Sequence, residues 1–284
     1  ASNNTAVGYA SLGANTTGAY NIAIGSYALD ANTTADYNVG MGYGALGAVV
    51  TGASNTAVGH QALEDNTASY NTAVGSNALL QNTTGAENVA MGSSSLDANT
   101  TGSYNVALGV GALGANTTAD NNTAIGYTAL LVNTTGTQNT AVGSLALDAN
   151  TTANNNTAVG YMALTANTTG FQNTAVGQHA MGVNTTGARN AAFGSAALDA
   201  SNGSDNTAIG DYALSANTTA SNNTAVGSLA LTANTTGATN VAVGQAALDA
   251  NTTASNNVAV GANAMTANTT GASNVAVGKG FFRS

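Results

Sequence analysis

A unit of 17 residues, close to N-T-A-V-G-x-x-A-L-x-A-N-T-T-G-x-x, repeats along the whole chain and constrains any fold that the chain can adopt. Fourteen of the sixteen intervals between successive units are 17 residues long and two are 16. Self-similarity at a fixed short period is typical of solenoids, whose coils bury a core only by stacking on one another. We number positions 1 to 17 from the opening asparagine, which is Asn4, Asn21, Asn38, Asn55, Asn71, Asn88, Asn105, Asn122, Asn139, Asn156, Asn173, Asn190, Asn206, Asn223, Asn240, Asn257 and Asn274.

Composition supports an ordered solenoid and excludes several classes of function. Charged residues make up 5% of the chain, against roughly 25% in an ordinary soluble domain. Proline, which would delete a ladder donor, is absent, and so is cysteine, which excludes disulfides and thiolate metal sites. The net charge of −9, with only three cationic side chains, argues against nucleic-acid binding. No apolar run is long enough to predict membrane insertion.

Each position of the unit has a predicted structural role. Position 4 is apolar in every copy and position 9 is almost always Leu, so we expect one Val-type and one Leu-type side chain per coil in the core, with alanines beside them. Positions 1–4 and 7–9 predict two short strands, and N-T-T-G predicts a turn. Position 5 is Gly in all seventeen copies, which indicates a positive φ or a crowded backbone. The asparagine at position 1 is predicted to point inward and to bond amide to amide along a ladder, rather than to form a surface column.

These roles predict an all-β fold, a parallel β-solenoid or β-roll of about seventeen 17-residue coils. We expect a single continuous domain over residues 1–284, with 279–284 as a divergent C-terminal end. A helical alternative fails because glycine and the Asn-Thr-Thr-Gly break leave no segment beyond about seven residues.

The pentapeptides N-T-A-V-G, N-I-A-I-G (21–25), N-T-A-I-G (122–126) and N-V-A-V-G (257–261) carry a family likeness. They resemble the head repeats of trimeric autotransporter adhesins of the YadA type, and similar arrays occur in bacteriophage tail fibres and bacterial surface proteins. The resemblance covers essentially the whole chain. It implies a left-handed parallel β-roll, commonly a homotrimer, with an extracellular adhesive or structural role.

Catalytic and metal chemistry have little to use in this sequence. His60 and His179 are seven coils apart, or about 34 Å. Six acids share position 10 at spacings of two or three coils, about 10–14 Å, whereas calcium needs several oxygens around one ion. We therefore predict that the protein is not an enzyme, has no cofactor or metal, and carries these charges for solubility: Asp30, Glu64, Asp97, Asp148, Asp199 and Asp249.

The Asn-Thr-Thr triplet at position 12 fits two roles. It can form an Asx or Ser/Thr turn, or each asparagine can accept a glycan as part of an N-x-T motif. The candidate glycan-attachment residues are Asn15, Asn32, Asn82, Asn99, Asn116, Asn133, Asn150, Asn167, Asn184, Asn217, Asn234, Asn251 and Asn268.

The threonines and tyrosines also suggest surface roles. A threonine array is a feature of ice-binding solenoids, but only one Thr of each adjacent pair could face such a plane. The ten tyrosines fall mostly at positions 6, 7 and 17 and crowd before residue 105. They either pack over turns or make adhesive contacts.

The two ends of the chain predict an assembly contact. The first three residues match positions 15 to 17 of the repeat, and the chain stops at position 11. The C-terminus of one copy and the N-terminus of the next would therefore together provide fourteen of the seventeen positions of a coil. This pattern predicts head-to-tail stacking into a filament; the alternative is a chain cut from a longer array. The predicted assembly residues are Ala1, Ser2, Asn3, Lys279, Phe281, Phe282 and Arg283.

The sequence therefore predicts a structural subunit of a fibre or filament, extracellular, on a cell surface or in a virion fibre. Its main partner is expected to be itself, by end-to-end stacking, trimerisation or both, with surface glycans as further partners. The alternative function is an adhesin or tail-fibre segment that binds host glycan or protein, and ice binding is a more distant alternative.

Overall fold

The computed structural model describes residues 1–280, which form the all-β parallel β-solenoid that the sequence predicts. Each coil contains one short strand. The chain divides into two compact units, residues 1–139 and residues 140–284.

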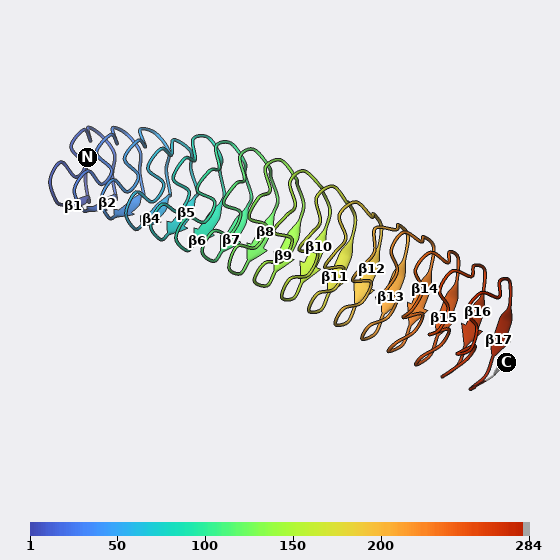
Figure 1. Ribbon diagram of the computed structural model, residues 1–284. Helices are drawn as coiled ribbons and strands as arrows, with labels where there is room; N and C mark the ends of the chain where they lie inside the picture. Colours follow the sequence, from blue (N-terminus) through green and yellow to red (C-terminus); the bar gives the residue numbers. More distant parts are fainter. Residues whose placement is uncertain (281–284) are drawn as a thin grey trace. The chain divides into compact units, whose positions relative to one another are not determined.

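The first unit contains eight strands that pair in parallel, each with the next along the chain (Figure 1). Pairing is in register, so Thr5, Ala6 and Val7 lie opposite Ile22, Ala23 and Ile24. The strands are β1 (Thr5–Val7), β2 (Ile22–Ile24), β3 (Val39–Met41), β4 (Thr56–Val58), β5 (Thr72–Val74), β6 (Val89–Met91), β7 (Val106–Leu108) and β8 (Thr123–Ile125).

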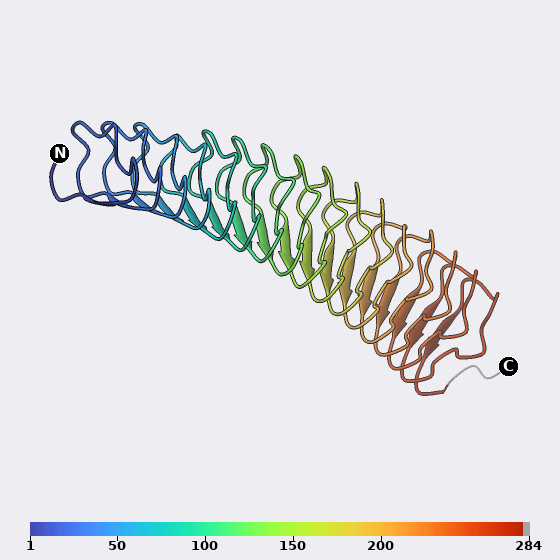
Figure 2. The same ribbon diagram turned by 60° about the vertical axis from the view of Figure 1, so that its left-hand side comes forward.

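The second unit contains nine strands with the same parallel, in-register pairing, and Figure 2 shows them in yellow to red along one wall of their coils. A shortened coil does not change the register, since β12 and β13 pair at the usual repeat positions. The strands are β9 (Thr140–Val142), β10 (Thr157–Val159), β11 (Thr174–Val176), β12 (Ala191–Phe193), β13 (Thr207–Ile209), β14 (Thr224–Val226), β15 (Val241–Val243), β16 (Val258–Val260) and β17 (Val275–Val277).

The core of each unit differs from the predicted one, because the Val-type residue of position 4 points outward. In β4, Ala57 is fully buried while Thr56 and Val58 are half-buried. Successive strand residues face opposite sides, so the small residue of position 3 is the one that enters the coil. Only a small side chain fits there: a Cβ on Gly40 would lie 3.3 Å from the Leu29 Cγ. The interior is therefore Ala at positions 3 and 8, Leu at position 9, and asparagine.

The predicted second strand at positions 7–9 is wrong, because these residues form turns. Positions 6–11 are turn throughout, and the residues at positions 7 and 9 have positive φ, for example 54° at Gln61 and 53° at Leu63. A left-handed conformation costs a non-glycine residue roughly 1–2 kcal/mol. Two features of the fold offset that cost: the Leu63 side chain is fully buried, and its N–H donates to the Ala78 carbonyl at 3.0 Å in the next coil.

Glycine at position 5 satisfies both of the predicted requirements at once. Gly92 has a φ of +133°, and a Cβ there would lie 2.6 Å from the carbonyl oxygen of Gly109 in the next coil. The Gly92 N–H also donates to the Val74 carbonyl at 2.8 Å. The backbone therefore turns out of the strand at a point where the next coil leaves no room for a Cβ atom.

Replacing Gly92 by Ala is expected to destabilise the first unit by on the order of 3 kcal/mol, through strained φ and displacement of the Gly109 carbonyl. The measurement is urea unfolding followed by circular dichroism. Gly114→Ala is the matched control, because Gly114 has no positive φ and its Cβ would come no nearer than 3.2 Å to Leu131 and 3.3 Å to the Gly111 carbonyl oxygen. Equal stability of the two variants would contradict this explanation of the repeated glycine.

Candidate functional site

The asparagine at position 1 points inward in both units and joins coils mainly through backbone groups. The Oδ1 atom of Asn38 accepts the Asn55 backbone N–H at 2.9 Å, and the Asn38 Nδ2 donates to the Gly52 carbonyl of its own coil at 2.8 Å. The predicted inward orientation is correct, but the amide group mostly bonds backbone rather than a second amide.

The amide-to-amide ladder lies instead at position 12, in the segment predicted as a turn. The Nδ2 atom of Asn99 donates to Asn82 Oδ1 at 2.7 Å and to the Gly102 carbonyl at 2.9 Å. Asn116 Nδ2 then donates to Asn99 Oδ1 at 2.9 Å, so the contact passes from coil to coil. Both asparagine columns are therefore structural, and one coil cannot satisfy them without its neighbours.

This burial bears on the thirteen candidate glycan-attachment residues. Asn15 and Asn268 are half-buried, and the other eleven have no exposed surface. Nδ2 is the atom to which an N-linked glycan attaches, and here it donates hydrogen bonds inside the coil. A glycan on these asparagines therefore requires modification before the coils close. Exposed threonines lie beside the ladder at position 14, for example Thr84 and Thr101.

The outer surface of the strands is a continuous uncharged feature of each unit. Positions 2 and 4 both face outward and hold only Thr, Val, Ile, Ala, Met, Leu or Phe in all seventeen copies. We call this surface the strand face. Several of its side chains are well exposed, with 46% for Met91 in β6 and 42% for Ile209 in β13.

The acids at position 10 lie along the turns in each unit. Burial raises the pKa of Asp97, Asp199 and Asp249 above the ordinary aspartate value. Asp199 also accepts the Gly182 N–H at 3.1 Å. Within residues 1–280, no group of three or more His, Asp or Glu side chains lies close enough together to hold a metal ion.

Aromatic side chains form a row over the turns of the first four coils. The rings of Tyr9 and Tyr27 lie 5.4 Å apart, those of Tyr27 and Tyr43 5.8 Å apart, and Tyr43 stacks on His60 at 5.5 Å. In the second unit, the ring of His179 contacts the ring of Tyr161. Both histidines therefore lie in aromatic contacts over turns.

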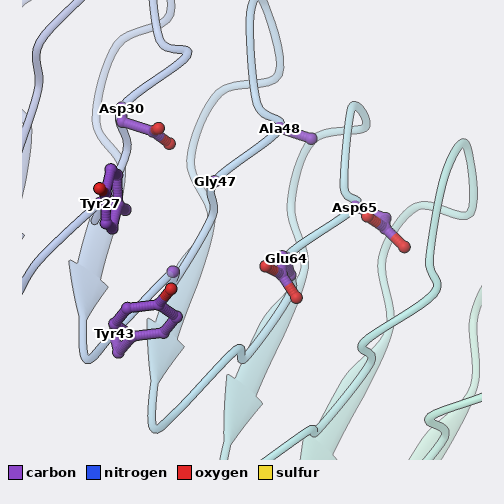
Figure 3. Close-up of a pocket in the computed structure, with 8 residues that line it drawn as sticks. Tyr27, Asp30, Tyr43, Gly47, Ala48, Glu64 and Asp65 are labelled. Carbon is purple, nitrogen blue, oxygen red and sulfur yellow. The ribbon is translucent and has the colours of Figure 1, made fainter.

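A hollow lies beside this row in the coil that opens at Asn38, which has glycine at positions 7 and 10. Its volume is about 420 Å³, and in Figure 3 Asp30 and Glu64 lie on opposite sides of Gly47, with Tyr27 below Asp30 and Tyr43 lower still. We call this hollow the notch. The residues that line it are Tyr27, Asp30, Tyr43, Gly44, Gly47, Ala48, Glu64 and Asp65. Reading positions 7 and 10 together could have located it in the sequence, since both are glycine only in this coil and in the coil opening at Asn105.

The residues predicted for assembly are exposed where the structure describes them. Ala1, Ser2, Asn3 and Lys279 are all at the surface, and the Ser2 carbonyl accepts the Tyr20 N–H at 3.1 Å. Phe281, Phe282 and Arg283 lie outside the described residues. The head-to-tail contact stays a prediction.

Comparison with known proteins gives no relative from which a function could be transferred. No family model matches the chain, and no curated protein matches it. Among the described residues, no helix has the length and apolar character needed to cross a membrane.

Replacing Asn99 by Ala is expected to destabilise the first unit by about 2–3 kcal/mol, because Asn82 Oδ1 loses its donor and a small cavity forms. Urea unfolding measures the loss. Thr101→Ala, an exposed change two residues along the same coil, is the control and should cost less than about 0.5 kcal/mol. If both changes cost the same, the buried ladder does not hold the coils together.

Proposed function

We propose that this protein is a non-enzymatic structural subunit of an extracellular fibre. Its solenoid coils would associate side by side into a homotrimer, stack end to end, or do both. The observation that carries the proposal is the strand face, a regular outward surface without a single charged residue. The likeness of the repeat to adhesin head repeats supports an extracellular location.

The dimensions and chemistry of the strand face suit association between proteins. In the first unit, eight strands spaced by about 4.8 Å make a strip about 34 Å long, with its two columns of side chains roughly 7 Å apart. Most of its side chains are β-branched or apolar, and they lie half-exposed. Contiguous exposed apolar surface of this kind marks interaction sites in soluble proteins.

A second copy of the chain is the occupant that fits this surface best. Two copies share one repeat distance, so the rows of side chains on one can lie between the rows of the other along the whole strip. The rest of the surface carries a net charge of −9, which opposes contact between copies elsewhere. The uncharged face is where that repulsion is weakest.

Replacing Met91 by Lys should lower the mass of the assembly, because the change places a charge in the middle of the strand face of the first unit. Sedimentation equilibrium of the wild type at micromolar concentration should give a multiple of the chain mass, and the variant a smaller one. Ser93→Lys is the matched control, since it adds the same charge to an exposed turn of the same coil.

The control variant should keep the wild-type mass. A wild-type protein that sediments as a single chain at every concentration would contradict lateral association. An equal loss of mass in both variants would attribute association to net charge rather than to the strand face.

A second candidate function, ice binding, rests on the same surface. Threonines of consecutive strands lie directly opposite one another at position 2, as in Thr140, Thr157 and Thr174 of β9, β10 and β11, with valines beside them at position 4. This flat array lies on the strands and not in the Asn-Thr-Thr segment where the sequence suggested it. Lateral association would bury the array, so the two functions exclude each other.

Thermal hysteresis of a dilute solution tests the second candidate. If the face binds ice, the wild type shows hysteresis and Thr157→Lys loses most of it, because the charge interrupts the array. Thr169→Lys, at an exposed turn position, should leave hysteresis unchanged. A wild-type protein without hysteresis contradicts ice binding.

A further inference from the structure

The notch arises because one coil lacks two side chains that its neighbours have. Its flanks are Tyr27 and Asp30 in the preceding coil and Gln61 and Glu64 in the following coil, at the same positions 7 and 10. Parallel coils are about 4.8 Å apart, so the gap between the flanks is roughly two coil spacings wide. A hollow of about 420 Å³ falls within the usual range for ligand sites.

Two carboxylates lean into this gap from opposite sides. Asp30 Oδ1 lies 3.5 Å from the point where a Cβ of Gly47 would stand, and Glu64 Oε1 lies 3.3 Å from the corresponding point of Gly44. Gln61 Nε2 donates to the other Glu64 oxygen, which holds that side chain in place. Asp65 also lines the hollow, but its carboxylate points away from Gly47 in Figure 3.

The first unit contains neither Lys nor Arg to neutralise these carboxylates, and its one histidine, His60, stacks on Tyr43. Residues 1–139 contain seven acids, and no Lys or Arg occurs before Arg189. Arg189 itself pairs with Asp205 at 2.7 Å within the second unit. Asp30 and Glu64 flank the gap from two different coils, so a cation placed between them is attracted by both.

The coil that opens at Asn105 provides a comparison within the same unit. It too has glycine at positions 7 and 10, yet Leu131 fills its gap, with Cδ1 3.6 Å and 3.2 Å from the Cβ points of Gly111 and Gly114. One acid, Asp97, lies beside that gap, and the position that corresponds to Tyr43 is Val110. The pair of glycines alone therefore does not open a charged hollow. The notch also has an unfilled gap, a second carboxylate and a tyrosine at position 6, and the second coil lacks all three.

We propose that the notch binds a cationic side chain, Lys or Arg, of a partner protein. The ammonium or guanidinium group would lie between Asp30 and Glu64, and its methylene groups would pack against the exposed edges of Tyr27 and Tyr43. Two carboxylates on opposite flanks are too few for a calcium ion, which takes six to eight oxygens. A neutral sugar would leave the paired negative charge without a counter-charge.

Fluorescence anisotropy with a labelled pentalysine peptide at low ionic strength tests the proposal on the full chain. We expect saturable binding that Glu64→Gln weakens at least five-fold, because the amide keeps the shape of the side chain and loses its charge. Asp97→Asn is the control variant. It removes one negative charge at the same repeat position, beside the gap that Leu131 fills, and it should change the affinity less than two-fold. Circular dichroism confirms that each variant is folded.

Two further probes identify the chemistry. A pentalysine peptide acetylated on every side-chain amine should not bind, and neither should a neutral cello-oligosaccharide. Equal losses with Glu64→Gln and Asp97→Asn would overturn the proposal in favour of diffuse attraction to an acidic chain. Absence of peptide binding, equal binding of the acetylated peptide, or oligosaccharide binding that Glu64→Gln abolishes would overturn it as well.

Discussion

The stacking of these coils depends on buried asparagine. The apolar interior contains little more than Ala and one Leu per coil, which is a thin core for a chain of this length. Two asparagine columns supply the continuity that this core lacks, because each amide is satisfied only when the next coil is present. Buried polar groups are costly unless they are paired, so the ladder enforces register as well as adding stability. The ladder at position 12 breaks at Ser201, and the buried Oδ1 of Asn184 is left without a partner there.

The narrow interior also determines what the protein shows to its surroundings. A strand only three residues long has one inward residue, and the space opposite the buried Leu admits Ala or Gly. The larger apolar residues on either side must then face outward, where they form the strand face. The surface most suited to association is therefore a direct consequence of how the coil closes. The turns vary between coils as well, and the notch is one product of that variation.

The sequence predicts the fold class well because its period, its invariant glycine and its lack of proline each have one dominant physical meaning. It predicts the wrong residues for the inward face of the strand. Val at position 4 is more hydrophobic than Ala at position 3 and was expected in the core, but the interior is so narrow that only the smaller residue fits there. The left-handed Leu residues were also missed, because no glycine or asparagine marks those turns. Asn at position 12 looked like a turn residue, and its hydrogen bonds to other coils depend on the stacking geometry. The strand face and the two carboxylates that flank the notch require the fold to be known.

The most direct test is to transfer the protein into D₂O and to measure, by nuclear magnetic resonance, how fast the asparagine side-chain amide protons exchange. The buried ladders predict a large group of slowly exchanging asparagine Nδ2 protons, while the exposed side-chain amides of Gln138 and Gln172 exchange at once. If the asparagine side-chain signals disappear as fast as those of these glutamines, the coils are not held together by buried asparagine, and the account is wrong.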